Sequence, residues 1–143
     1  MNMTLMIVKL STSETLLTDL GVDEEHKIYI LLNPILLNSA QTPKGEVTIA
    51  SQYMPGLFDD VIFVRFDSVI TLCEASPFYR KLYGTALLRA YIQHESQQLA
   101  ADGNEDEENL LSVRVKLKKV ELMAHYGIID EEKDSTITSV SLH

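Results

Sequence analysis

The chain has 143 residues, of which 45% are hydrophobic and 23% are charged, so it has the length of one domain and enough apolar material for a core, which excludes wholesale disorder. Twelve Lys and Arg against 21 Asp and Glu give a net charge of −9, which argues against a protein that grips long nucleic acid through its backbone. The single cysteine excludes a disulfide framework and a multi-cysteine zinc site. Because neither a secretory signal nor a membrane-spanning apolar stretch is visible, we expect a cytoplasmic protein without membrane contact.

The first part of the chain alternates between short apolar segments and turn residues. Apolar or β-branched residues run together, or alternate with polar ones, and predict strands at 5–10, 15–20, 27–37, 47–53, 61–66 and 69–73. Asn33 and Pro34 interrupt the third segment and predict a bend there, since proline cannot donate a hydrogen bond to a central ladder. Turn signals at roughly ten-residue spacing are typical of a small barrel or sandwich.

A helix is predicted to follow the strands, with Ser76 as its N-cap and Pro77 in its first helical position. Apolar residues then recur at three- and four-residue steps along one stripe: Tyr79, Leu82, Tyr83, Ala86, Leu87, Ala90 and Tyr91. We expect the helix to bury this stripe against the sheet or against a neighbouring subunit. The tyrosines of the stripe are accordingly interpreted as packing residues rather than as platforms for bases.

The sequence changes character after His94, which is predicted to lie at the end of this helix. Residues 95–109 are polar and acidic and predict a mobile linker. Residues 110–127 form an extension whose apolar spacing fits a helix and a strand equally well. Residues 128–143 are acidic and then rich in Ser and Thr, which predicts a flexible tail. The expected organisation is a domain at 1–94 followed by these three segments.

Groups of residues that could perform enzymatic chemistry are scarce. The six glycines are scattered, so they form neither a Walker loop nor a dinucleotide fingerprint, and the four histidines never fall at metal-ligand spacing. Cys73 is interpreted as a small strand-face residue, and the adjacent Asp59 and Asp60 as a solvated turn. The only basic cluster is interpreted as a solvated face: Lys116, Lys118 and Lys119. We therefore expect a non-enzymatic protein with no metal and no other cofactor.

Arg65 is the most informative charged residue. It shares a strand face with two apolar residues, Val61 and Phe63, and stands immediately before a tight turn. One interpretation is a structural ion pair with Asp67. The other is functional, because a guanidinium at the end of a strand can hold a phosphate or a base edge.

The order of strands and turns up to about residue 94 resembles the Sm-like family. Residues 6–20 look like its opening hairpin, and Asp23 to Lys27 stand where its first RNA-contacting loop falls. The segment VRFDSVITL at 64–72 is similar to the family's arginine-glycine turn between its last two strands, with Phe66 in place of the glycine. Leu32-Asn33-Pro34 and CEASP at 73–77, with the following helix, look like the Sm-like proteins encoded by tailed phages. The helix follows the strands here, whereas the family's usual helix precedes them.

This resemblance implies a mainly β fold: a strongly bent five-stranded antiparallel sheet or open barrel, followed by a C-terminal α-helix and an extra C-terminal segment. It also implies a homo-oligomeric ring, because edge strands of neighbouring subunits can pair. In the first reading of function, the ring contacts short single-stranded RNA through Arg65, Asp67, His26 and Lys27. In the alternative, it is a phage-type structural or assembly factor that binds another protein through residues 95–127, without nucleic acid. A phage-encoded chain would act in the host cytoplasm.

Overall fold

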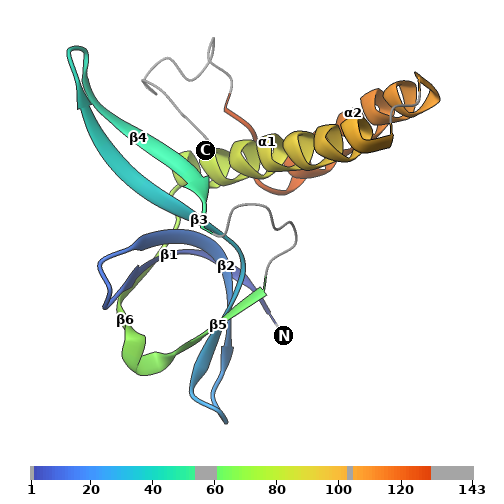
Figure 1. The fold of residues 1–143 in the computed structure, drawn as a ribbon. Helices are drawn as coiled ribbons and strands as arrows, with labels where there is room; N and C mark the ends of the chain where they lie inside the picture. Colours follow the sequence, from blue (N-terminus) through green and yellow to red (C-terminus); the bar gives the residue numbers. More distant parts are fainter. Residues whose placement is uncertain (1, 54–60, 103–104, 130–143) are drawn as a thin grey trace.

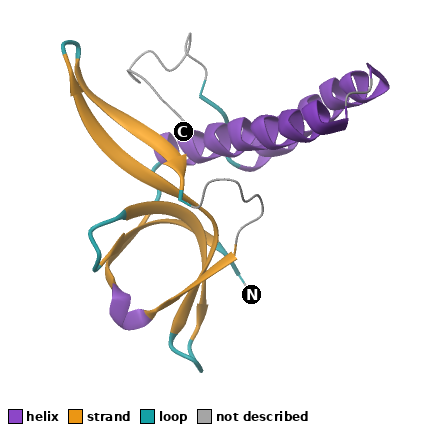
Figure 2. Ribbon diagram, viewed as in Figure 1, coloured by secondary structure: helices purple, strands orange, loops and turns teal. Residues whose placement is uncertain are grey.

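The computed structural model describes residues 2–53, 61–102 and 105–129. The elements follow one another along the chain as β1 (Thr4–Leu10), β2 (Thr15–Asp23), β3 (Ile28–Thr42), β4 (Gly45–Gln52), β5 (Val61–Arg65), a 3-10 turn η1 (Phe66–Ser68), β6 (Val69–Glu74), α1 (Pro77–Asp102) and α2 (Glu105–His125). The strands form a bent sheet, and the two helices lie together to one side of it (Figures 1 and 2). The expected mainly β fold, with a bent antiparallel sheet followed by a helix, is confirmed.

The sheet is antiparallel and open. Its strands run in the order β4-β3-β2-β1-β6, and β5 pairs with β3 outside this path. The strand β3 is long enough to serve two partners along one edge, since its residues 28–32 pair with β5 and its residues 35–42 pair with β4. The six strands lie at the six segments predicted from the sequence, whereas the family resemblance implied a sheet of five. The strands β3 and β4 extend together as a hairpin beyond the part of the sheet that curls into the barrel (Figure 1).

The predicted bend in β3 is confirmed, and it separates the two partners of this strand. Asn33 adopts a φ of +49°, which asparagine tolerates better than most residues. Pro34 follows and is buried. The neighbouring strand β2 has a register irregularity at the same level, between Leu17 and Asp19. The Thr18 hydroxyl donates a hydrogen bond of 2.9 Å to the Leu32 carbonyl there, so a side chain replaces part of the interrupted ladder.

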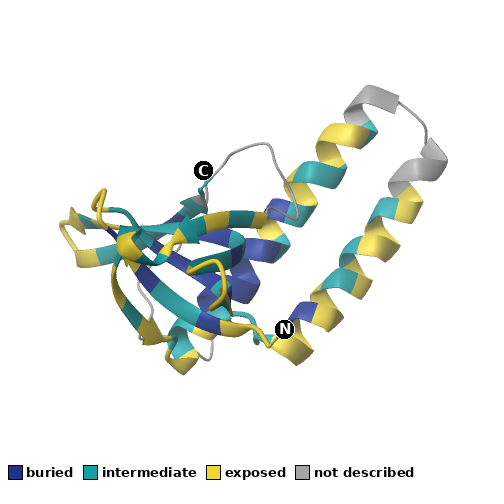
Figure 3. Ribbon diagram, turned by 90° about the horizontal axis from the view of Figure 1, so that it is seen from below, coloured by how far each residue is buried: buried dark blue, intermediate teal, exposed yellow. Residues whose placement is uncertain are grey.

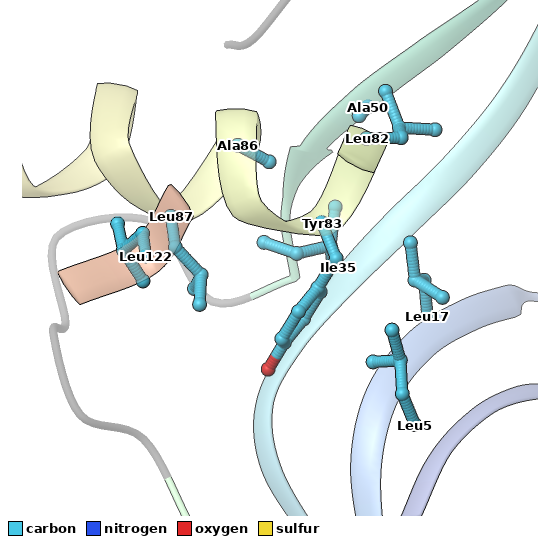
Figure 4. Packing of buried hydrophobic residues seen from close by; sticks show 9 residues of the cluster. All are labelled: Leu5, Leu17, Ile35, Ala50, Leu82, Tyr83, Ala86, Leu87 and Leu122. Carbon is cyan, nitrogen blue, oxygen red and sulfur yellow. The ribbon is translucent and has the colours of Figure 1, made fainter. Parts of the chain in front are cut away.

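Two groups of buried residues hold the molecule together. One fills the inside of the curled sheet: Val8, Leu10, Leu16, Leu20 and Leu31. The other lies between the sheet and the helices: Leu5, Leu17, Ile35, Ala50, Leu82, Tyr83, Ala86, Leu87 and Leu122 (Figure 4). Because successive strand residues face opposite sides of a sheet, β2 contributes Leu16 to the first group and Leu17 to the second.

The helix α1 begins at Pro77, as predicted, after Ser76, whose hydroxyl oxygen lies 3.5 Å from the Tyr79 amide nitrogen. The central part of its apolar stripe is buried: Leu82, Tyr83, Ala86, Leu87 and Ala90. The expectation that the stripe packs against the sheet is confirmed, and α2 covers the helix from another side (Figure 3). In the part of the chain that the structure describes, no helix is both long and apolar enough to cross a lipid bilayer.

The predicted linker at 95–109 is wrong. The helix α1 continues to Asp102 and α2 begins at Glu105, so these two helices include most of the segment, and His94 lies inside α1 rather than at its end. Glu, Gln, Leu and Ala dominate this segment and are good helix formers. The carboxylate of Glu95 also lies 3.4 Å from the Arg114 guanidinium of the opposite helix. The acidic composition predicts a mobile linker, but most of the segment forms the adjoining ends of two helices.

The extension at 110–127 is a helix up to His125 and not a strand. Leu122 is 4% exposed and belongs to the core between sheet and helices. The sequence allowed either a helix or a strand here, and contact with α1 decides for the helix. A helical period places Leu122 and the half-buried Leu111 and Val115 together on the side that faces α1.

The predicted tail at 128–143 begins too early. The Ile129 amide donates a hydrogen bond of 2.9 Å to the Thr85 hydroxyl, and Ile129 packs against the core. Gly127 has a φ of +83°, and its carbonyl oxygen would lie 2.2 Å from a Cβ placed on Gly84. The chain therefore stays packed on α1 after α2 has ended. Residues 130–143 lie outside the described residues.

Candidate nucleic-acid interface

The first candidate segment is the turn between β2 and β3. The Asp23 carboxylate accepts a hydrogen bond of 3.1 Å from the His26 amide, and its other oxygen lies 2.9 Å from His26 Nδ1. These bonds, the backbone one foremost, lower the pKa of Asp23 below its ordinary value. Lys27 follows with a φ of +55°. Asp23 thus organises the turn, and His26 and Lys27 are exposed on it.

The second candidate segment is η1, between β5 and β6. Arg65 is the last residue of β5, and its Nε lies 3.7 Å from a carboxylate oxygen of Asp67. The interpretation of Arg65 as the ion-pair partner of Asp67 is therefore confirmed. Their side chains are 78% and 76% exposed, and ion pairs so open to solvent contribute little to stability. A ligand that competes for the guanidinium thus has little to displace.

Strand pairing brings the two segments together. Ile28 at the start of β3 pairs with Arg65 at the end of β5, and the Phe66 amide donates a hydrogen bond of 3.0 Å to the Lys27 carbonyl. The Tyr29 and Phe66 rings pack with their centres 4.6 Å apart beneath this contact. The sequence-based candidates His26, Lys27, Arg65 and Asp67 therefore belong to two adjoining turns, which we call the rim.

A third turn adjoins η1. The Ser11 amide, between β1 and β2, donates a hydrogen bond of 2.8 Å to the Ser68 carbonyl. The turn η1 is therefore held by backbone contacts to the turns on both sides of it, and its position does not depend on the ion pair between Arg65 and Asp67. Chemically the rim offers an exposed guanidinium, ammonium and imidazole beside four carboxylates, those of Asp23, Glu24, Glu25 and Asp67, a set suited to reversible binding of a small hydrogen-bonding group.

Sequence reasoning missed the aromatic contact beneath the rim and the exposed apolar side chains beside it. In the resemblance to the Sm-like family, Phe66 is only a replacement for a glycine, whereas in the structure its ring packs on Tyr29. Val61 and Phe63 on β5 and Ile70 on β6 are 52%, 64% and 62% exposed. The alternation in β5 was the available signal, since Ile62 and Val64 point the opposite way and pack on the inner core.

The remaining candidates lie elsewhere. Lys118 is 3.7 Å from a Glu121 carboxylate and 5.5 Å from the centre of the Tyr91 ring, on α2 and away from the rim. Cys73 is exposed on β6. Tyr83 is fully buried, in keeping with its predicted packing role. Asp59 and Asp60 lie outside the described residues.

Neither a protein-family model nor a curated protein matches the chain. Within residues 2–53, 61–102 and 105–129, no three His, Cys, Asp or Glu side chains are grouped so that they could hold a metal ion. What the rim does must therefore be argued from its own geometry.

Proposed function

We propose that the chain is a non-enzymatic, Sm-like protein that assembles into a homo-oligomeric ring and contacts short single-stranded RNA at the rim. The observation that carries the proposal is the backbone contact between Lys27 and Phe66, which joins the turn after β2 to the turn after β5. These are the segments that resemble the two RNA-contacting signatures of the Sm-like family. Their positive and hydrogen-bonding groups, Arg65, Lys27 and His26, are all exposed.

The edges of the open sheet support the ring. Among the described strands, β5 pairs only with β3 and β6 only with β1, so each has an edge without a partner strand. Exposed edges invite pairing with another chain, and the exposed Val61, Phe63 and Ile70 lie on these same two strands. Pairing β5 of one subunit with β6 of the next would satisfy backbone groups and cover apolar surface. Repeated with a closing rotation, it gives a ring.

Net charge limits the size of the RNA. A chain with a net charge of −9 repels a long polyanion, so contact is expected at one or a few nucleotides per subunit. The carboxylates of Asp23 and Asp67 stand among the cationic groups. They favour hydrogen-bonding groups of a base over a row of phosphates, because a carboxylate accepts hydrogen bonds and repels a phosphate.

Native mass spectrometry of the purified chain tests both parts. We expect a multiple of the chain mass with an excess of nucleotide size, and Arg65→Ala should remove the excess without changing the multiple. Lys44→Ala is the matched control: it removes one positive charge from the exposed turn between β3 and β4, away from the rim, and should leave the excess in place. Excess mass that persists in Arg65→Ala would contradict the assignment of the rim.

The ring is tested separately by Phe63→Asp. This residue is 64% exposed on β5, so the subunit should fold, while a carboxylate placed against a partner strand should weaken association. Val22→Asp, at a 42% exposed position on β2, is the control. Sedimentation of the unaltered chain as a bare monomer at micromolar concentration would contradict the ring.

A second candidate is a structural or assembly factor that binds another protein without nucleic acid. The apolar side chains exposed on α2 favour it: Leu110, Val113, Leu117, Val120 and Met123. Deletion of residues 96–143 would be a poor test, because it also removes Leu122 from the core. A pull-down with Leu117→Glu keeps Leu122 in place. Loss of a captured protein in that variant, with no nucleotide excess in the unaltered chain, would favour this candidate.

A further inference from the structure

The helix α2 is apolar on two opposite sides. Leu122 is buried, and Leu111 and Val115 are half-buried, on the side that packs on α1. The opposite side carries a second apolar stripe, which we call the outward face: Leu110, Val113, Leu117, Val120 and Ala124. A helix that is apolar on both sides is typical of the middle of a packed layer, yet this stripe is exposed, with Leu117 and Val120 at 66% and 68%.

The spacing of the outward face is that of a coiled-coil seam. Its residues are separated by three, four, three and four positions, which is the a/d pattern of a heptad repeat, with leucine or alanine at a and valine at d. The stripe on the α1 side has the same type of spacing, but Lys118 occupies one of its positions, between Val115 and Leu122. The outward face is therefore suited to another helix lying nearly parallel or antiparallel to α2.

Charges beside the seam indicate what this helix is. Arg114 and Glu121 occupy the two e positions of the heptads. In an antiparallel pair, e positions face e positions, so Arg114 of each helix would lie opposite Glu121 of a second copy, and the attraction would occur twice. A parallel pair would instead align the basic residues at 114–119 with themselves, which like-charge repulsion disfavours.

We propose that the outward face of α2 pairs, antiparallel, with the outward face of a second copy of this chain. The result is a four-helix layer in the order α1, α2, α2 and α1, with one sheet at each end. The end of α2 that joins the sheet carries Leu122, and the helical hairpin extends away from there (Figure 3). An antiparallel pair therefore keeps the two sheets apart. This contact uses different residues from the β5 and β6 edges and does not depend on the proposed ring.

One such contact is small. The stripe from Leu110 to Ala124 is about 21 Å long, and it covers less than the ~800 Å² per partner of a typical stable interface. We therefore expect a concentration-dependent pair. If the chain also forms rings, several α2 contacts would act together between two rings and strengthen one another.

Native mass spectrometry and sedimentation across about 1 to 100 micromolar protein test the contact. Leu117→Glu should halve the largest particle mass, from dimer to monomer or from paired rings to single rings. The dissociation constant of the pair should rise about 100-fold, because a carboxylate would face apolar side chains. Ser112→Glu adds the same charge at an exposed position outside both apolar stripes and should change nothing. Unchanged mass in Leu117→Glu overturns the proposal, whatever the Phe63→Asp variant shows of the ring.

A charge exchange identifies the occupant. Arg114→Glu alone and Glu121→Arg alone should each weaken the pair, because each places like charges opposite one another twice. A mixture of the two variants should restore association, since every e-position pair is then opposite in sign. The contacts of Arg114 with Glu95 and of Lys118 with Glu121 within one chain are not restored by mixing, so a merely structural role predicts no rescue. If the mixture shows no rescue, the outward face does not pair with a second copy of this chain. The same result is expected if another protein binds this face.

Discussion

The rim and the junction between helices and sheet lie at opposite ends of the same stretch of β3, and they are built differently. At the rim, Arg65 and Asp67 form an open ion pair whose members are more than three-quarters exposed. At the junction, the buried Tyr83 hydroxyl donates to the Leu32 and Asn33 carbonyls at 2.9 and 3.1 Å. Interactions of buried groups are costly to lose, whereas exposed ion pairs are not. We infer that the junction carries stability and leaves the rim free to bind.

The largest effect is expected at the closest approach within the junction. In Gly84→Ala the new Cβ would lie 2.2 Å from the Gly127 carbonyl oxygen, a backbone atom that cannot turn aside as a side chain can. We expect a loss of roughly 3 kcal/mol in the free energy of unfolding, the upper range for overpacking. Urea denaturation measures it, with Gln93→Ala at an exposed position of the same helix as the control. A loss below about 0.5 kcal/mol would show that the segment after α2 is not held against α1.

A smaller loss is expected from Tyr83→Phe. The aromatic ring still fills the core, but the Asn33 carbonyl loses the donor that reaches it across the bend, while Leu32 keeps the Thr18 hydroxyl. An unsatisfied buried acceptor costs about 1–2 kcal/mol. The same denaturation experiment measures the change. An unaltered midpoint would mean that the bend in β3 does not need the helix.

Alkaline pH should weaken the junction and spare the rim. Burial raises the pKa of Tyr83, and burial together with the hydrogen bond to Asp19 raises that of Tyr126, above the ordinary value of 10.0. The unfolded chain therefore loses these protons first, so the stabilisation is complete below pH 10 and declines as the pH rises above it. The slope of unfolding free energy against pH above 10 should flatten in the double variant Tyr83→Phe, Tyr126→Phe. An equal slope in both proteins would contradict the assignment.

The rim should be weakened by acidic rather than alkaline pH, and the effect should be small. The pKa of Asp23 is lowered from 3.8 by its bonds to His26, so its contribution is present above pH 3.8 and is lost as the pH falls through the lower folded value. Asp23→Asn should therefore be less stable than the unaltered chain near neutral pH, and this difference in the free energy of unfolding should shrink as the pH falls below about 4. A difference that is constant across this range would show that the carboxylate does not organise the turn.

The smallest effect on stability is expected from Arg65→Ala. Its ion pair with Asp67 is exposed, so the midpoint of unfolding should stay within about 0.5 kcal/mol of the unaltered chain. The same variant is expected to lose bound nucleotide, which separates binding from folding. A marked destabilisation would mean that the rim is part of the structural frame and would remove the contrast with the junction.

Local chemistry in the sequence was sufficient for the strands, the bend at Asn33 and Pro34, and the start of α1 at Pro77, because turn residues, proline geometry and helix capping act over a few neighbouring positions. The candidate residues of the rim could also be named in advance, since a polar turn and a strand-end arginine are visible in one dimension. Their adjacency came only through the family resemblance, as no spacing in the chain connects Lys27 with Phe66.

Tertiary contacts decided the rest. The place of β5 in the sheet depended on β3 having one edge long enough for β4 and β5 together, a property of pairing rather than of any one segment. The acidic segment after His94 became helix instead of linker, and the extension became helix instead of strand, because α1 and α2 pack on each other and Leu122 and Ile129 reach the core. Patterns of charge and apolar spacing describe the surface a segment can offer, and only its packing partners determine which surface is used.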